Sequence, residues 1–275
     1  MVRYLFCLIL FVISTWIIPD HVYPQQNSAQ SLYLKVDYFK AEGSDISEYL
    51  DVELNLWKEL HQERYNRGII KSWDFYQVVA GAVDSDYNYV AINVFDDFSM
   101  IDYFDLESII QSVYPEMDPD ELMERTRNSR EVIRTEIWEV NGRLMKSGLD
   151  SPGGDYMTFN YFDARDSSGE HMALEFDFWG PVHETRLDLN ILNSWAMYTL
   201  LYPSGDAKKY TYATIDAYDN LADLIEPIDV SLAKAAHPQL TDEELDDYLI
   251  TRTSEARTLY KSELWKRIGF VGSAK

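Results

Sequence analysis

Two triplets of residues recur along the chain at a spacing that would place a tryptophan, a histidine and an arginine on one helix face. The residues are Trp57, His61, Arg64, Trp179, His183 and Arg186. Side chains three, four or seven positions apart share one face of an α-helix. The tryptophan would stack a flat ligand, the histidine would act as a base or a ligand, and the arginine would bind an anionic group. We therefore take His183 and His61 as candidate catalytic residues and the other four as candidate ligand-binding residues.

The same triplets also suit a purely structural role. The tryptophan would then pack on a sheet, the histidine would hydrogen-bond a backbone carbonyl, and the arginine would pair with a nearby carboxylate. Repetition leaves both interpretations open, because packing positions recur in a duplicated chain as readily as binding positions do. Only in the second triplet do Gly180 and Pro181 interrupt the helical pattern beside the histidine. They indicate either a kink that opens a pocket or a late helix start, and they make His183 the preferred site.

The triplets belong to a longer internal repeat. Six segments of the first half match six segments of the second half in the same order, at offsets of 122 to 127 residues. For example, residues 33–39 (YLKVDYF) match residues 156–162 (YMTFNYF). An ordered series of matches at a nearly fixed period indicates duplication. We predict a signal peptide over 1–26, a first unit over 31–147 and a second unit over 155–272.

Each unit is predicted to follow the order strand, helix, strand, strand, helix, strand. In the first unit the expected strands cover 33–39, 69–81, 87–95 and 133–144, and the expected helices cover 45–66 and begin again near 97. Alternating apolar residues support the strands, and apolar spacings of three and four support the first helix. Asp118 before Pro119, and Thr241 with Glu244, are helix-start signals at corresponding positions. This order of elements is the ferredoxin-like unit.

Two such units in one chain resemble the dimeric α/β-barrel superfamily of antibiotic-biosynthesis monooxygenase-like and EthD-like proteins. The pattern W-x-x-x-H-x-x-[RK] on the first helix, followed by [IL]-x-S-W on the second strand, resembles tandem duplicated secreted members of unassigned function. The resemblance implies an α+β fold in which two tandem ferredoxin-like βαββαβ units form an intrachain dimeric α/β barrel with helices outside. It does not identify a reaction.

Haem-degrading monooxygenases of that superfamily use asparagine, tryptophan and histidine, which implies a comparison with Asn160, Trp195 and His183. Here the tryptophan falls on the second strand instead of the third, and Asp37 stands in the first unit where Asn160 stands in the second. We therefore expect no cofactor and keep Asn160 and Trp195 as ligand-binding candidates. Trp195 also suits a core position, because it alternates with Ser194 across the strand.

Metal and thiol chemistry are not expected, and we predict no metal site. Beyond residue 26 the chain holds four histidines, so a multi-histidine site would need residues from both units. The single cysteine, Cys7, lies in the N-terminal apolar run. A processed chain would therefore contain no disulfide, thiolate ligand or cysteine nucleophile.

The N-terminal 26 residues have the pattern of a secretory signal peptide. Arg3 precedes an apolar run over 4–18, which Asp20 and Pro24 then break. That run is shorter than the roughly 20 residues that a membrane span needs. An uncleaved anchor is the alternative. We expect a secreted or periplasmic protein.

The charge balance excludes whole classes of partner. Asp and Glu number 47 against 24 Lys and Arg, giving a net charge of −23. Such a chain repels phosphate backbones and anionic lipid surfaces. We expect no nucleic acid, no membrane contact after processing, a monomer with an internal pseudo-dimer, and a small hydrophobic or aromatic ligand.

Three functions are compatible with these features. The main one is a secreted or periplasmic small-molecule-binding protein with an aromatic and histidine pocket between sheet and helices. The first alternative is a cofactor-independent monooxygenase or isomerase of the dimeric α/β-barrel type, with His183 or His61 as the base. The second alternative is a structural or interaction protein with no open pocket. The sequence leaves open whether the chain is an enzyme, and a cavity that touches His61 or His183 would discriminate.

We expect the mature protein to begin between about Gln25 and Ser31, because signal peptidase cleaves after the apolar run. N-terminal sequencing of the native protein checks this. A chain that still begins at Met1 in a membrane fraction would contradict it.

Overall fold

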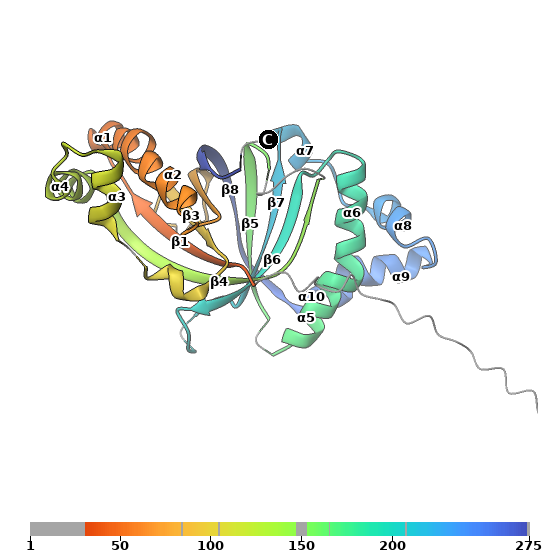
Figure 1. Ribbon diagram of the computed structural model, residues 1–275. Coiled ribbons are helices and arrows are strands. Elements are labelled where there is room, and N and C mark those ends of the chain that lie inside the picture. Colours follow the sequence, from red (N-terminus) through yellow and green to blue (C-terminus); the bar gives the residue numbers. More distant parts are fainter. Residues whose placement is uncertain are drawn as a thin grey trace, which may run out of the picture.

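Eight antiparallel strands close into a barrel in the order β1-β3-β2-β8-β5-β7-β6-β4. The computed structural model describes residues 31–83, 85–103, 105–146, 153–164, 166–206 and 208–273. The expected signal peptide and part of the expected linker lie outside the described residues. Helices cover the barrel on two sides, with α1–α4 on one side and α5, α6 and α8–α10 on the other (Figure 1).

In the first half, one helical region connects β1 to β2 and a second connects β3 to β4. Its elements are β1 (Tyr33–Lys40), α1 (Asp45–Asp51), η1 (Val52–Trp57), α2 (Lys58–Asn66), β2 (Ser72–Ala80), β3 (Tyr89–Phe95), η2 (Phe98–Ile101), α3 (Leu106–Val113), α4 (Pro119–Ser129) and β4 (Glu131–Met145).

The second half follows the same order. Its elements are β5 (Tyr156–Asp163), α5 (Ser168–Leu174), η3 (Glu175–Trp179), α6 (Gly180–Asp188), β6 (Ser194–Tyr202), β7 (Tyr212–Tyr218), α7 (Leu221–Leu224), α8 (Val230–Ala236), α9 (Asp242–Asp246), η4 (Asp247–Arg252), α10 (Thr253–Ala256) and β8 (Thr258–Val271).

The last strand of each half closes the barrel by pairing with both halves. β4 pairs with β1 in its own half and with β6 in the other, so Trp138 lies between Leu34 and Leu200. β8 pairs in the same way with β5 and β2, so Trp265 lies between Met157 and Val78. β4 has 15 residues and β8 has 14, which gives each strand the length to serve two neighbours.

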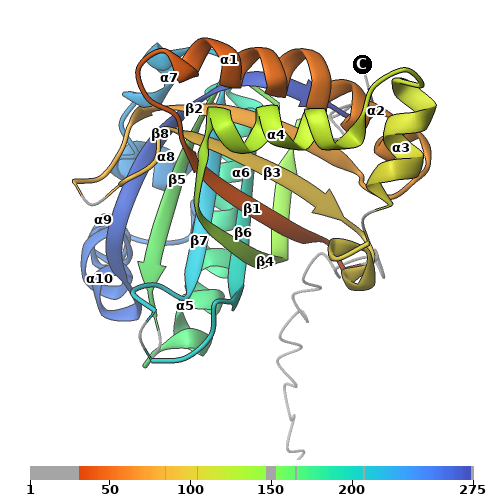
Figure 2. The ribbon, with the colours of Figure 1, turned by 90° about the vertical axis from the view of Figure 1, so that its left-hand side faces the viewer.

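Strand alternation separates the barrel interior from the helix-covered face. On β1, Leu34, Val36 and Tyr38 belong to the core cluster inside the barrel, whereas Phe39 belongs to the cluster under the helices. Successive side chains of a strand point to opposite faces, so one strand supplies both cores. Figure 2 shows α1, α2 and α4 lying over the outer face of the first-half strands.

Helix starts follow the signals in the sequence. Asp118 caps α4 by accepting a hydrogen bond from the Asp120 amide, and Thr241 forms a capping box with Glu244 at α9.

The helix around Pro181 does not break: the π-helical turn η3 runs directly into α6, with the proline in the first turn of α6. The first half has a π-helical turn, η1, at the corresponding place without a proline, so the proline is not its cause. None of the described helices is long and apolar enough to cross a bilayer.

We expect a fragment of residues 31–146 to self-associate or aggregate. Without the second half, β2 and β4 become open edges and the apolar interior around Trp138 is exposed, and both features promote association. Light scattering on the fragment, with the whole chain as the control, measures this. A folded, stable monomer of the fragment would contradict the pairing of the two halves.

Candidate functional site

A cleft of about 450 Å³ opens between the helices and the sheet of the first half. Its floor is buried and its rim, at Asp102 and Val132, is exposed. The remaining lining residues are Lys35, Asp37, Phe39, Glu53, Trp57, His61, Arg64, Trp73, Ala91, Asn93, Ile101, Arg130 and Thr135. The structure therefore brings the first triplet together at one cleft.

Each member of the first triplet is held by a specific contact. The Trp57 indole N–H donates to Thr126 Oγ1 on α4 at 2.9 Å. The His61 ring stacks on Trp73 of β2, with ring centroids 4.8 Å apart. Arg64 Nη1 lies 2.9 Å from His61 Nδ1.

The contact with Arg64 fixes the chemistry of His61. A guanidinium can only donate hydrogen bonds, so His61 Nδ1 must accept and the ring proton must lie on Nε2. Burial, together with the nearby Arg64 charge, lowers the pKa of His61 well below its usual value. His61 is thus a neutral ring that offers an N–H donor, which does not suit the role of general base in this arrangement.

The second triplet repeats these contacts. The Trp179 indole donates to Thr253 Oγ1 at 3.2 Å, His183 stacks on Trp195 at 5.2 Å, and Arg186 Nη1 lies 3.0 Å from His183 Nδ1. Burial lowers the pKa of His183 to about 4, although the neighbouring Asp216 opposes the shift. His183 is as buried as His61, and its ring stacks on the buried Trp195.

The two arginines differ in the partner that the sheet supplies. Arg186 donates to the Asp216 carboxylate at 2.8 Å and to the Tyr218 hydroxyl at 3.0 Å. Arg64 donates to the amide oxygen of Asn93 at 3.0 Å, at the position corresponding to Asp216. Burial lowers the pKa of Arg64 to about 10. At Arg186 burial acts in the same direction, but Asp216 and Tyr218 together outweigh it and raise the pKa.

Asn160 and Trp195 lie with the second triplet. Ser262 Oγ donates to Asn160 Oδ1 at 2.6 Å, and Asn160 Nδ2 lies 3.5 Å from an Asp216 carboxylate oxygen. Trp195 is 2% exposed and packs in the second-half core with Met197. The sequence candidates therefore form two groups on opposite sides of the barrel and do not build one shared site (Figure 1).

Sequence reasoning missed an ion pair beside each triplet. Arg130 at the start of β4 pairs with the buried Glu53 of η1, and Arg257 pairs with the buried Glu175 of η3. Burial raises the pKa of Glu53, although Arg130 opposes the shift. Both pairs follow the repeat offsets, which is the signal that could have revealed them.

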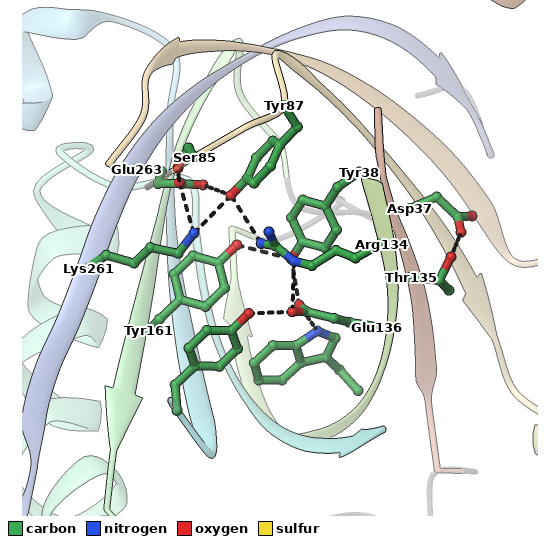
Figure 3. A network of polar contacts seen from close by, with 12 residues as sticks. Asp37, Tyr38, Ser85, Tyr87, Arg134, Thr135, Glu136, Tyr161, Lys261 and Glu263 are labelled. Atoms are coloured by element: carbon green, nitrogen blue, oxygen red, sulfur yellow. Dashed lines mark hydrogen bonds and ion pairs between the residues drawn. The ribbon is translucent and has the colours of Figure 1, made fainter. Parts of the chain in front are cut away.

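Sequence reasoning also missed a polar network inside the barrel, shown in Figure 3. Tyr38 donates to Glu136 at 2.7 Å, and its hydroxyl lies 3.0 Å from the hydroxyl of Tyr161, the residue 123 positions later. Tyr87 of the first half donates to Glu263 of the second at 2.5 Å. The reciprocal bond runs from Tyr210 to Glu136. Each half thus supplies a phenol to the carboxylate of the other.

Solved structures share this architecture, although no protein-family model and no curated protein matches the chain. A proposed monooxygenase from Lactobacillus acidophilus NCFM is 10% identical, with 88% of this chain and 96% of that chain covered and a TM-score of 0.50. A second, from Fusobacterium nucleatum, is 8% identical, with 89% and 95% covered and a TM-score of 0.52. The fold is that of a dimeric α/β barrel. At this identity the likeness confirms the α+β barrel that the sequence predicted, and it identifies no reaction.

Within the described ranges, no three or more His, Cys, Asp or Glu side chains are arranged to hold a metal ion.

We expect the protein to lose stability as the pH falls from about 6.5 towards 4. Burial lowers the pKa of His183 to about 4 and of His171 to about 3, so between these values and 6.5 the unfolded chain binds protons that the folded chain does not. The contribution of these neutral histidines to the free energy of unfolding is fully present above pH 6.5 and is lost as the pH falls below it. In this window, each such histidine lowers the free energy of unfolding by about 1.4 kcal/mol for every pH unit of acidification.

His183→Gln should flatten this slope, because glutamine does not titrate yet can still accept a hydrogen bond from Arg186. Thermal melts of the two proteins between pH 4 and pH 8 measure the difference. An unchanged slope in the variant would contradict a neutral, buried His183.

Proposed function

We propose that the first-half cleft binds a small aromatic molecule through an oxygen that carries, or develops, negative charge. The observation that carries this proposal is Asn93, which stands at the cleft floor where the second half has Asp216. In the second half the sheet itself supplies the anion to the buried arginine. In the first half the corresponding position supplies a neutral amide, and the charge of Asp37 on β1 only partly offsets the effect of burial on Arg64. A ligand oxyanion would add a second negative charge beside this arginine.

The lining residues divide into recognisable roles around such a ligand. Arg64 supplies a buried positive charge, and His61 supplies a neutral N–H donor that Arg64 holds in one tautomer. Trp57 supplies aromatic surface for a flat ring, and the fully buried Trp73 supports the His61 ring from behind. Donors held in place in a poorly solvated site are suited to stabilise an oxyanion.

Asp37 is the candidate proton acceptor in the same cleft. Its side chain is 16% exposed, and Thr135 Oγ1 donates to its carboxylate at 2.6 Å. A carboxylate that reaches solvent at the rim can take a proton from a bound phenol, enol or activated C–H group. In this proposal Asp37 is the base, and His61 and Arg64 stabilise the oxyanion that develops on the ligand.

An enzyme is favoured over a simple binding protein by the fold shared with the two proposed monooxygenases, and this remains an analogy. Moving one proton through Asp37 suffices for an isomerisation. Oxygenation would require in addition that the resulting carbanion reduce dioxygen, the oxidant, without a cofactor. The binding-protein function keeps the same cleft and the same ligand chemistry without the turnover.

Two further parts of the proposal rest on sequence features. Contacts that recur at the same offsets, such as the Trp-His-Arg triplets, support an origin as two tandem ferredoxin-like units within one monomer. The apolar run over 4–18 supports a secreted or periplasmic location.

We expect Asn93→Asp to weaken binding of 2-naphthol, an aromatic probe with an ionisable oxygen, by about tenfold or more. The new carboxylate would pair with Arg64 as Asp216 pairs with Arg186, and it would repel an oxyanion. A tenfold loss corresponds to about 1.4 kcal/mol. Isothermal titration calorimetry measures the affinity.

The matched control is Asp216→Asn, which makes the reciprocal change on the other side of the barrel. It should lower the melting temperature and leave the probe affinity within about twofold. Equal effects of the two variants on binding, or no binding of the probe to the wild type, would reject the cleft as the site. Asp37→Asn should keep the affinity and abolish any turnover of a ligand that native mass spectrometry identifies on the protein.

A further inference from the structure

A second cleft, of about 370 Å³, opens at one end of the barrel and not under the helices. It lies between the β6–β7 connection and the N-terminal parts of β4 and β8. Its charged lining residues are Asp86, Arg134, Glu136, Lys208, Lys209 and Lys261. Four are basic and two are acidic, so the lining carries a formal charge of +2 in a chain whose net charge is −23. A positive cleft on a strongly negative protein concentrates anions locally.

Two of the four cations are fixed by the network inside the barrel (Figure 3). Arg134 Nε donates to Glu136 at 3.1 Å, and the guanidinium lies 3.8 Å from the centroid of the Tyr38 ring. Lys261 Nζ donates to Glu263 and to the Tyr87 hydroxyl, both at 3.0 Å. These cations are held in position before any ligand arrives, which reduces the entropy lost on binding.

The other two cations break the symmetry of the repeat. Lys208 and Lys209 stand 123 positions after Ser85 and Asp86. In the first half, Ser85 donates a hydrogen bond to Glu263 and so completes the network. The second half places two lysines on the corresponding connection, with Lys209 exposed. Their positive charge is therefore a property of one connection and not of the barrel architecture.

Aromatic rings form the wall beside these charges. Tyr210 and Tyr260 have ring centroids 5.7 Å apart, and Lys209 Nζ lies 5.3 Å from the Tyr260 ring. Trp138 stacks on Tyr210 and holds it in place. A flat ring could lie against this wall while an attached anionic group reaches the lysines.

We propose that this end of the barrel is a binding site for a small aromatic carboxylate. The carboxylate would lie among Lys208, Lys209 and Arg134, and its ring would pack on Tyr210 and Tyr260. The site is separate from the helix–sheet cleft of the first half, and it is built from both halves of the chain.

Isothermal titration calorimetry with 1-naphthoate tests the proposal, with the neutral 1-naphthamide as the matched ligand. We expect the carboxylate to bind at least about tenfold more tightly than the amide, and we expect its affinity to fall with added salt. The double variant Lys208→Gln/Lys209→Gln should weaken naphthoate binding by about tenfold, because it removes two positive charges from the cleft lining, one on the half-buried Lys208 and one on the exposed Lys209. Lys266→Gln, an exposed lysine of β8 outside the cleft, should leave the affinity within about twofold.

Equal affinity for naphthoate and naphthamide, no binding of naphthoate, or full binding by the double variant would each overturn the proposal. Asn93→Asp separates the two sites, because it adds a negative charge only in the helix–sheet cleft. If that variant abolishes naphthoate binding, the carboxylate occupies the helix–sheet cleft and the barrel-end site is rejected. If it has no effect while the double lysine variant does, the barrel-end site stands even where the proposed function of the other cleft fails.

Discussion

Two carboxylates buried inside the barrel, Glu136 and Glu263, are the constraint on which the rest of the structure depends. A buried charge that lacks partners costs several kcal/mol, so each carboxylate must be surrounded by donors. Neither half supplies all of them. Each glutamate takes a cation and a tryptophan N–H from its own strand and a phenol from the opposite half. The two halves of the barrel are therefore joined by hydrogen bonds across the interior, as well as by the pairing of β4 with β6 and of β8 with β2.

The helix-covered faces of the two halves differ, although both halves contribute to the same interior. Asn93 and Asp216 occupy corresponding strand positions and give the two buried arginines different partners. Tyr49 and His171 stand at corresponding helix positions, and each packs near its own arginine–glutamate pair. Among the described residues, the His171 ring nitrogens have no hydrogen-bond partner. The helix-covered face of the first half opens into the cleft at His61, whereas His183 on the other face is packed on Trp195.

Local patterns in the sequence were sufficient for the elements and their order. Strand alternation, helical spacing and the caps at Asp118 and Thr241 act over a few residues, so they are visible without a structure. The Trp-His-Arg triplets were also visible, and the structure gathers each of them on one helix face. The preference for the second triplet rested on Pro181, but the helix continues through that region and the cleft that touches a triplet histidine lies at His61.

Other features depend on contacts between distant parts of the chain. The tautomer of His61 follows from the direction in which Arg64 points, and helical spacing alone does not give that direction. The bond from Tyr87 to Glu263 joins residues 176 positions apart, so no short-range pattern reports it. The repeat did contain a usable signal, because a residue paired in one half predicts its equivalent in the other, as Glu53 with Arg130 predicts Glu175 with Arg257.

The pairing of β2 with β8 has a consequence for the order of folding. Trp73 lies opposite Val271, so an early strand completes its hydrogen bonds only after the residues up to Val271 have been synthesised. Contacts between such distant residues close slowly, because the loop entropy is lost before the contact forms. During translation, the first half has an unpaired strand edge until β8 is made, and such an edge is prone to aggregation. The abundant surface carboxylates, which repel neighbouring copies of the chain, would protect the nascent protein during that interval.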